Sequence, residues 1–342
     1  MSVLKRVVSP LGKDASHTIR IQWSLGNSCN FSCEYCPSEL HNGSYPWKPI
    51  QEYINAVDKF LPIFAEHKDH ITIEFIGGEV TVMPGILELL SHIKTNYNNV
   101  TTFMFTNGSR TVRWWSQAKH LIDEIVYSYH IDSLDHTHMI EVVEEIKDSI
   151  YCSFHLAGVE GKVHECDRIS YLIRDCFKQG SPQDYWNVNI NVKTMLVKEL
   201  NNRNARMGQN FYDYTSDELF IMQKQSWLEN PDAPPPDPNA PPPPKPHPSD
   251  WLITFEYDDK TLYYELDQIV KDKLNTFKGM KCSIGMEKFN IDMKGDVKSS
   301  WCGAKDYGNV YDNTFQMPEP TGTLCPFDYC NNLSDIQISK TA

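Results

Sequence analysis

The stretch Cys29-Asn-Phe-Ser-Cys33-Glu-Tyr-Cys36 places three thiols in a C-x3-C-x2-C arrangement, directly after a predicted strand. Thiolates this close in sequence can bind one metal centre, and iron–sulfur clusters are held by such cysteine runs. A cluster of four irons binds four ligands, one at each iron. Three cysteines therefore leave one iron free for a substrate or cofactor. The alternatives are a zinc knuckle and three unrelated thiols.

The chain around the triplet alternates between the hydrophobic periods of strands and of helices. We expect strands at 18–25, 71–76, 100–106, 124–130, 149–156 and 185–196, and helices at 50–66, 84–97, 112–122, 136–147 and 163–177. Six strands that alternate with helices imply parallel pairing and right-handed crossovers. The fold class is therefore α/β, with either a doubly wound sheet or a barrel.

The predicted strands are apolar at one parity and polar at the other. The strand at 18–25, for example, alternates Ile19 and Ile21 with Arg20 and Gln22. Buried parallel strands are usually apolar on both faces, and an unpaired buried polar group costs roughly 1–3 kcal/mol. We therefore expect the polar parity to line a cavity that holds water or a ligand. The alternative is that these polar groups pair with one another in a packed core.

The ten cysteines form two groups besides three isolated residues. The second group gathers after residue 281, and a hairpin predicted at 289–301 would bring its first two members together. Four thiolates satisfy a tetrahedral zinc ion or a fully ligated iron–sulfur cluster equally well. The members of this group are Cys282, Cys302, Cys325 and Cys330, and the isolated residues, which we expect to pack as small hydrophobic side chains, are Cys152, Cys166 and Cys176.

Composition narrows the class of protein. The formal charge of −13, from 45 acidic and 32 basic residues, argues against sequence-independent binding of nucleic-acid phosphates, because such binding needs clustered Lys and Arg. No apolar run approaches the roughly 18 residues of a membrane helix, and the first residues lack the apolar core of a signal peptide. Two groups of metal-binding thiols suit a reducing compartment, so we expect a cytoplasmic location.

Four regions are predicted along the chain: a loose lead-in over 1–17, the α/β unit over 18–202, an insert over 203–277, and a C-terminal region over 278–342. The insert contains the segment 231–248, which has 11 prolines in 18 residues. Such a density favours polyproline II or disorder over helix and sheet, and a semi-rigid spacer over a docking site. A hairpin over 251–265 and a linker helix over about 266–277 are predicted to follow it.

The triplet, with Tyr35 before its third cysteine, resembles the radical S-adenosylmethionine (radical SAM) superfamily. The resemblance implies a partial six-stranded (β/α) TIM-like barrel. It also implies that Cys29, Cys33 and Cys36 ligate a [4Fe–4S] cluster whose open iron chelates the amino and carboxylate groups of SAM.

Further motifs extend the resemblance along the barrel. Gly77-Gly78-Glu79 lies where the family contacts the SAM amino group, and glycines there let the backbone approach a ligand. Ser128 matches a position that binds the SAM ribose or carboxylate. Thr106 and Asn107 occupy the family's strand-end segment, which could equally be a plain strand-to-helix turn. Together with Tyr35, these residues are the expected cofactor-binding set.

The C-terminal region is similar to the twitch region, the shortened form of the SPASM extension of radical SAM enzymes. The matching marks are Cys282, the Ile291-Asp292-x-x-Gly295-x-Val297 turn, Cys302 and Gly308-Asn309-Val310. The resemblance implies a small α+β iron–sulfur region, built around a β-hairpin, with an auxiliary [4Fe–4S] cluster. The full extension has more cysteines, so four support one auxiliary cluster at most. Structural zinc is the alternative.

Three polar residues on the predicted strands are the expected catalytic residues. His130, His155 and Lys193 each lie near the C-terminal end of a strand, where β/α barrels place their active sites. A neutral His or a Lys there could orient a hydroxyl or take a proton from the substrate. These side chains could instead pair internally or contact SAM.

The expected function follows from the resemblance. SAM is cleaved reductively to a 5′-deoxyadenosyl radical, which takes hydrogen from an unactivated carbon of a small molecule. The outcome is an oxidation or an epimerisation, with the auxiliary cluster as electron relay and a reductant such as flavodoxin or ferredoxin. The alternative is a maturase that modifies a peptide or protein side chain. No nucleic-acid polymer and no membrane are expected as partners.

Overall fold

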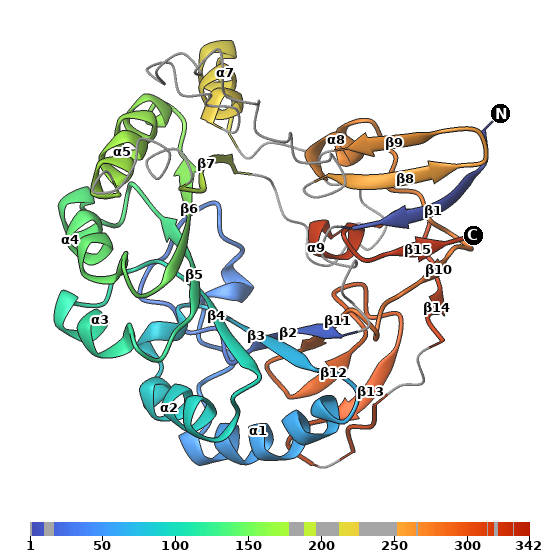
Figure 1. The fold of residues 1–342 in the computed structure, drawn as a ribbon. Coiled ribbons are helices and arrows are strands. Elements are labelled where there is room, and N and C mark those ends of the chain that lie inside the picture. The colour runs from blue at the N-terminus through green and yellow to red at the C-terminus, as the bar shows by residue number, and fades with distance from the viewer. Residues whose placement is uncertain are drawn as a thin grey trace, which may run out of the picture.

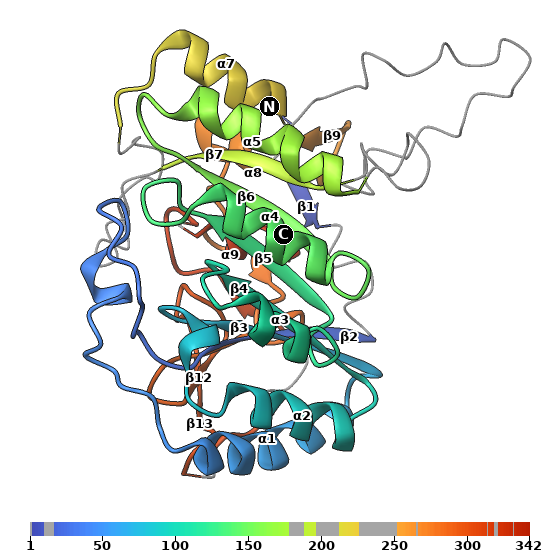
Figure 2. The same ribbon diagram turned by 90° about the vertical axis from the view of Figure 1, so that its left-hand side faces the viewer.

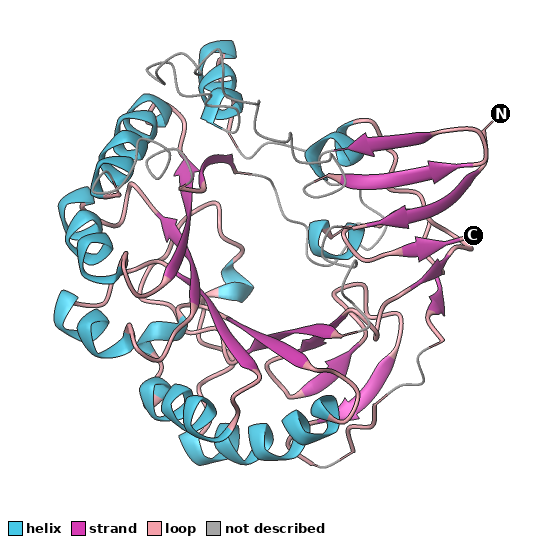
Figure 3. Cartoon of the chain, viewed as in Figure 1, coloured by secondary structure: helices cyan, strands magenta, loops and turns pink. Residues whose placement is uncertain are grey.

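The computed structural model describes residues 2–9, 17–177, 188–195, 212–225, 252–264, 266–312, 314–317, 321–330 and 332–342. The proline-rich segment 231–248 lies outside these ranges. The described residues form two β-sheets, with helices covering one face of the larger sheet (Figures 1 and 3).

The larger sheet contains the six predicted strands in chain order, and consecutive members pair in parallel. Five helices connect them and cover the outer face, which Figure 2 shows from the front. The α/β class is therefore confirmed. The strands are β2 (Thr18–Ser24), β3 (His70–Ile76), β4 (Val100–Thr106), β5 (Glu124–Tyr129), β6 (Tyr151–Gly158) and β7 (Ile190–Thr194), and the helices are α1 (Ile50–Ala65), α2 (Ile86–Asn96), α3 (Val112–Ala118), α4 (His136–Ile146) and α5 (Val163–Cys176).

The apolar strand parity packs against these helices, as the sequence predicts. Trp23 of β2 is fully buried, and its ring lies 5.8 Å from that of Tyr53 and 5.2 Å from that of Phe60, both on α1. Burying each such side chain stabilises the fold by about 1.5–3 kcal/mol. The opposite parity faces the concave side of the sheet, which lies towards the C-terminal elements (Figure 1).

The C-terminal hairpin extends the larger sheet. Strand β11 (Lys288–Ile291) pairs in parallel with β2, with Phe289 opposite Ile21. Strands β12 (Asp296–Lys298) and β13 (Asp306–Asn309) follow beyond it. The sequence predicts the hairpin, but the pairing with β2 is not visible from local patterns because the two segments lie far apart in the chain.

The smaller sheet collects strands from three distant parts of the chain, in the order β14-β10-β15-β1-β8-β9. Residues 4–8 form β1 between β15 and β8, with Val7 fully buried, so the prediction of a loose lead-in over 1–17 is wrong for these residues. The bounds are β1 (Leu4–Val8), β8 (Ile253–Tyr257), β9 (Thr261–Tyr264), β10 (Lys281–Cys282), β14 (Thr323–Leu324) and β15 (Lys340–Thr341), with helices α7 (Ser216–Gln225), α8 (Leu266–Lys271) and α9 (Leu333–Ile336) and the 3-10 turns η2 (Ser38–Leu40) and η3 (Val80–Val82).

Within the described ranges, no helix has the length and apolar character needed to cross a lipid bilayer.

Candidate functional site

The cysteine triplet lies in the loop that follows β2. Cys29, Cys33 and Cys36 are all half-buried. The backbone N–H of Cys36 donates to the carbonyl of Cys33 at 3.0 Å, and the N–H of Phe31 donates to Cys29 Sγ at 3.4 Å. The triplet is thus at the carboxyl end of a parallel strand, the end at which open α/β sheets bind ligands.

The loop after β3 packs directly on the cysteine loop. Gly78 N donates to Gly26 O at 3.1 Å, and Glu79 N donates to Ser28 O at 2.9 Å. A Cβ on Gly78 would lie 2.1 Å from Ser28 O, and one on Gly77 would lie 2.4 Å from Gly26 O. In this structure the two glycines therefore let one backbone approach another, whereas the sequence led us to expect approach to a ligand.

The Glu79 side chain joins the loops after β3 and β4. It is 1% exposed and accepts four hydrogen bonds, from Thr81 N (3.1 Å), Thr81 Oγ1 (2.6 Å), Thr106 Oγ1 (2.8 Å) and Asn107 N (2.6 Å). Burial raises the pKa of this carboxyl, and the hydrogen bonds oppose that shift. Thr106 and Asn107 are thus placed beside the Gly77-Gly78-Glu79 segment by the carboxylate between them.

Two amides complete the junction of the three loops. Asn107 Nδ2 donates to Asn30 Oδ1 at 3.1 Å, and Asn30 Nδ2 donates to Ser109 Oγ at 2.8 Å. Asn30 lies inside the cysteine triplet. The loops that follow β2, β3 and β4 are therefore linked through side chains as well as backbone.

His130 lies against the triplet. Its Nδ1 is 2.6 Å from Tyr35 Oη and 3.5 Å from Cys33 Sγ, and its ring stacks on that of Tyr35. Burial lowers the pKa of His130 to about 4 and raises that of Tyr35. The structure thus brings together two residues that the sequence assigned to different roles, Tyr35 to the cofactor and His130 to the substrate.

Ser128 and His155 lie side by side and are both half-buried. They are direct partners in the β5–β6 register, and Asn191 of β7 is the next partner in the same row. The backbone of Lys193 pairs with Ala157, and its side chain lies outside the described part of the structure. Ser128 lies in β5 two residues before His130, which follows the end of that strand and contacts the triplet at Cys33.

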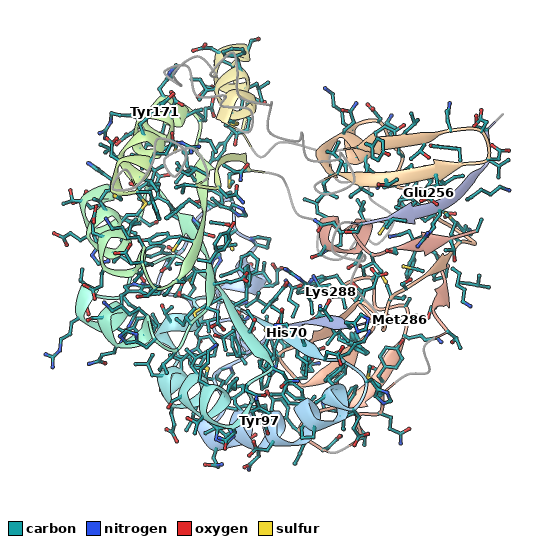
Figure 4. All side chains as sticks on the ribbon, in the orientation of Figure 1. His70, Tyr97, Tyr171, Glu256, Met286 and Lys288 are labelled. Atoms are coloured by element: carbon teal, nitrogen blue, oxygen red, sulfur yellow. The ribbon has the colours of Figure 1, made fainter. Side chains whose placement is uncertain are left out.

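Deeper on the concave face, the polar residues pair with one another. Glu74 is 4% exposed; it accepts from Arg20 Nη1 at 2.7 Å and from Gln22 Nε2 at 3.1 Å, and lies 3.8 Å from Lys288 Nζ. Lys288, labelled in Figure 4, also donates to Ser334 Oγ of α9 at 2.6 Å. The alternative of internal pairing therefore holds for this part of the interior.

The tail cysteines lie close to one another. Cys282 and Cys302 share a small apolar cluster with Ile284 and Ile338, and Cys325 N donates to Met280 O, two residues before Cys282, at 2.8 Å. Burial raises the pKa of Cys302 to about 12, with further contributions from Asp335, Cys282 and Cys325. Burial also raises the pKa of Cys330, which interacts electrostatically with Cys282 and Cys302.

The turn at 291–297 and the Gly308-Asn309-Val310 segment, two motifs of the C-terminal region, also lie close together. Asp292 Oδ1 accepts from Lys294 N and Asp296 N, and Val310 N donates to Gly295 O at 2.9 Å. Gly295 has φ +91°, where a side chain would be strained, and a Cβ there would lie 2.2 Å from the ring of Tyr311. The Asp292–Gly295 turn is thus packed against the Gly308-Asn309-Val310 segment.

Sequence reasoning missed two buried charged residues beside the tail cysteines. Asp335, 2% exposed, accepts from Ser300 Oγ and, at 2.7 Å, from Cys302 N. Lys340, 1% exposed, lies opposite Cys282 in the β10–β15 pair. No local signal marks either residue, because only the tertiary fold brings them to the cysteines.

Among the residues that the structure describes, no three His, Cys, Asp or Glu side chains converge closely enough to hold a single metal ion.

Residues 23–151 match the model of the radical SAM superfamily. The chain therefore carries a radical SAM superfamily domain in that segment, which contains the triplet, the Gly77-Gly78-Glu79 segment and the complete strands β3, β4 and β5. No curated protein matches the sequence of the chain at a significant level.

Several solved structures resemble the fold at low sequence identity. Native anSMEcpe with bound AdoMet is 16% identical over 87% of this chain and 79% of that chain, with a TM-score of 0.49. BtrN in complex with AdoMet and 2-DOIA is 11% identical over 86% and 79%, with a TM-score of 0.40. Streptococcus suis SuiB bound to precursor peptide SuiA is 12% identical over 87% and 64%, with a TM-score of 0.35.

Proposed function

We propose that this chain is a radical SAM enzyme with a partial (β/α)6 barrel that acts on a small molecule. Cys29, Cys33 and Cys36 would hold the [4Fe–4S] cluster. When bound, that cluster and SAM supply a 5′-deoxyadenosyl radical that takes hydrogen from an unactivated carbon of the substrate. The net reaction is an oxidation or an epimerisation.

The observation that carries the proposal is the junction of three loops around the triplet. Three thiols with one open coordination position fit a four-iron cluster that also binds a ligand. The backbone of Gly78 and Glu79 is hydrogen-bonded to the cysteine loop, and Asn107 is hydrogen-bonded to Asn30 within it. A loop fixed on two sides presents its thiols in one arrangement, as a preorganised site requires.

The chain's own residues have identifiable tasks in this proposal. Tyr35 and His130, in contact beside Cys33, hold the cysteine loop against the end of β5. Ser128 and His155, in the next row of the sheet, face the space where SAM and substrate would lie. Gly77 and Gly78 keep the neighbouring backbone close enough for its polar groups to reach a ligand at the cluster.

The four tail cysteines fit an auxiliary [4Fe–4S] cluster. Cys282 and Cys302 share one apolar cluster, and the N–H of Cys325 donates to Met280 O, two residues before Cys282. A cubane holds its thiolates further apart than a single zinc ion does. Four cysteine ligands leave no open iron for substrate, so electron relay is the role that suits the cluster. Reduced flavodoxin or ferredoxin in the cytoplasm would supply the electron for SAM cleavage.

The test is anaerobic reconstitution of the full chain with iron and sulfide. Two clusters would give about eight irons per chain. Replacing Cys29, Cys33 and Cys36 together by Ala should remove about half of this iron and all formation of 5′-deoxyadenosine. The matched control is the corresponding triple replacement of Cys152, Cys166 and Cys176, which lie in regular elements and should leave both readouts near the wild-type values. Persistent SAM cleavage by the first variant would refute the assignment.

The substrate class is tested by soaking the reconstituted enzyme with candidate small molecules and, separately, with peptides. A substrate of the right class should raise the yield of 5′-deoxyadenosine above the unstimulated background. A response to peptides and to no small molecule would overturn the small-molecule proposal in favour of a maturase.

A further inference from the structure

Lys340 is a buried cation beside the tail cysteines. It is the first residue of β15 and lies directly opposite Cys282 in the antiparallel β10–β15 pair. Side chains at directly opposite positions of an antiparallel pair project from the same face of the sheet. The lysine stem and the Cys282 thiol therefore share one side of the smaller sheet, next to α9 (Figure 1).

The Lys340 ammonium is fixed by backbone carbonyls. Nζ donates to the carbonyls of Asp335 at 2.9 Å, Ile336 at 3.2 Å, and Ile338. It also lies 4.7 Å from the centroid of the Phe277 ring. All three acceptors are neutral groups, so they solvate the ammonium without cancelling its charge. A lysine held in this way is rigid and keeps its charge at a defined distance from the cysteines.

The two buried charges lie next to different tail cysteines. Lys340 is the register partner of Cys282. The Asp335 carboxylate instead accepts the N–H of Cys302 at 2.7 Å. The site is therefore electrostatically uneven, with its positive side at Cys282 and its negative side at Cys302.

We propose that Lys340 is a positioning residue that raises the reduction potential of the auxiliary cluster. The inference rests on the proposed function, since it takes the four tail cysteines as the ligands of an iron–sulfur cluster. Gaining one electron makes a cluster more negative, and a fixed positive charge nearby stabilises that state. Potentials of iron–sulfur clusters follow local charge, hydrogen bonds and exposure, and charges act strongly in a buried, low-dielectric setting.

The experiment is a potentiometric titration of the reconstituted full chain followed by electron paramagnetic resonance. The auxiliary signal is taken as the one that SAM does not alter. Lys340→Gln and Lys340→Met, which remove the charge, should shift the auxiliary potential to more negative values. Lys340→Arg, which keeps the charge, should stay near the wild-type potential. The matched control is Lys278→Met, because Lys278 is in the same region but 61% exposed and paired with Asp328.

Each outcome supports or overturns the proposed effect of Lys340 on the reduction potential. Neutral variants that keep their iron and the wild-type potential would overturn the inference. If the neutral variants lose the cluster and Lys340→Arg retains it, the charge of Lys340 serves to hold the cluster and not to set its potential, and the inference is overturned. Loss of the cluster from all three variants would make Lys340 a structural residue and overturn it. The proposed function fails separately: zinc in place of half the iron in the wild-type chain would show that the tail cysteines hold no cluster.

Discussion

Removing the Glu79 carboxylate should weaken the junction of the three loops by a predictable amount. In Glu79→Gln the amide oxygen can keep the three donors now on Oε1, and the amide NH₂ then opposes the N–H of Asn107. One buried donor without an acceptor costs about 1–3 kcal/mol. In Glu79→Ala two backbone donors, on Thr81 and Asn107, lose their acceptor, which costs about 2–6 kcal/mol, twice the cost of one donor.

The assay is urea unfolding of the apo chain, combined with hydrogen exchange of the peptides that contain Thr81 and Asn107. We expect the midpoints to fall in the order wild type, Gln, Ala. Faster exchange should be confined to the Asn107 peptide in the Gln variant and should reach both peptides in the Ala variant. The control Glu88→Gln, at an exposed position of α2, should change stability by no more than about 0.5 kcal/mol. A Glu79→Ala variant with wild-type midpoint and protected amides would refute the reasoning.

Three further predictions concern iron and turnover. Gly78→Ala forces its Cβ to within 2.1 Å of Ser28 O, so reconstituted iron should fall by about half, at the triplet only; full iron content would contradict the packing argument. Replacing 231–248 by a short Gly/Ser linker should leave iron content and SAM cleavage near normal, because such a run buries little; loss of folding would show otherwise. His155→Gln and Lys193→Gln should keep abortive SAM cleavage and lose coupled turnover with the true substrate, and unchanged coupling in both would count against the parity argument.

The alternation of strands and helices could be predicted because each element carries its own period. Strand β4 has the predicted bounds, and α1 and α4 differ from prediction by one residue at the C-terminus. Helix ends set by a backbone turn were harder to place. Helix α8 ends at Lys271 instead of 277, where Lys273 adopts the left-handed conformation with φ 59°. An apolar pattern continues past that point and gives no sign of the turn.

Features that depend on distant partners were beyond the sequence. Residues 4–8 are too few to show a clear period, and their pairing is supplied by strands near residues 254 and 340. The contact of Tyr35 with His130 joins a loop to a strand end 95 residues away. The Lys340 and Asp335 charges gain their neighbours only from the packing of the smaller sheet against α9. In each case the local sequence fixes the residue type and the tertiary fold fixes its surroundings.

The pairing of β11 with β2 also constrains how the protein is made. The open edge of β2 is covered only when residue 291 has been synthesised, 267 residues after residue 24. At 5–20 residues per second, translation leaves that edge unpaired for about 13 to 53 seconds. An unpaired strand edge is a template for wrong association, so we expect nascent chains to need a chaperone during this interval. Ribosome-bound chains stalled before residue 288 should be cleaved by protease within β2 and should take up no cluster at the triplet; a stalled chain that resists protease there would show that the edge is protected by other means.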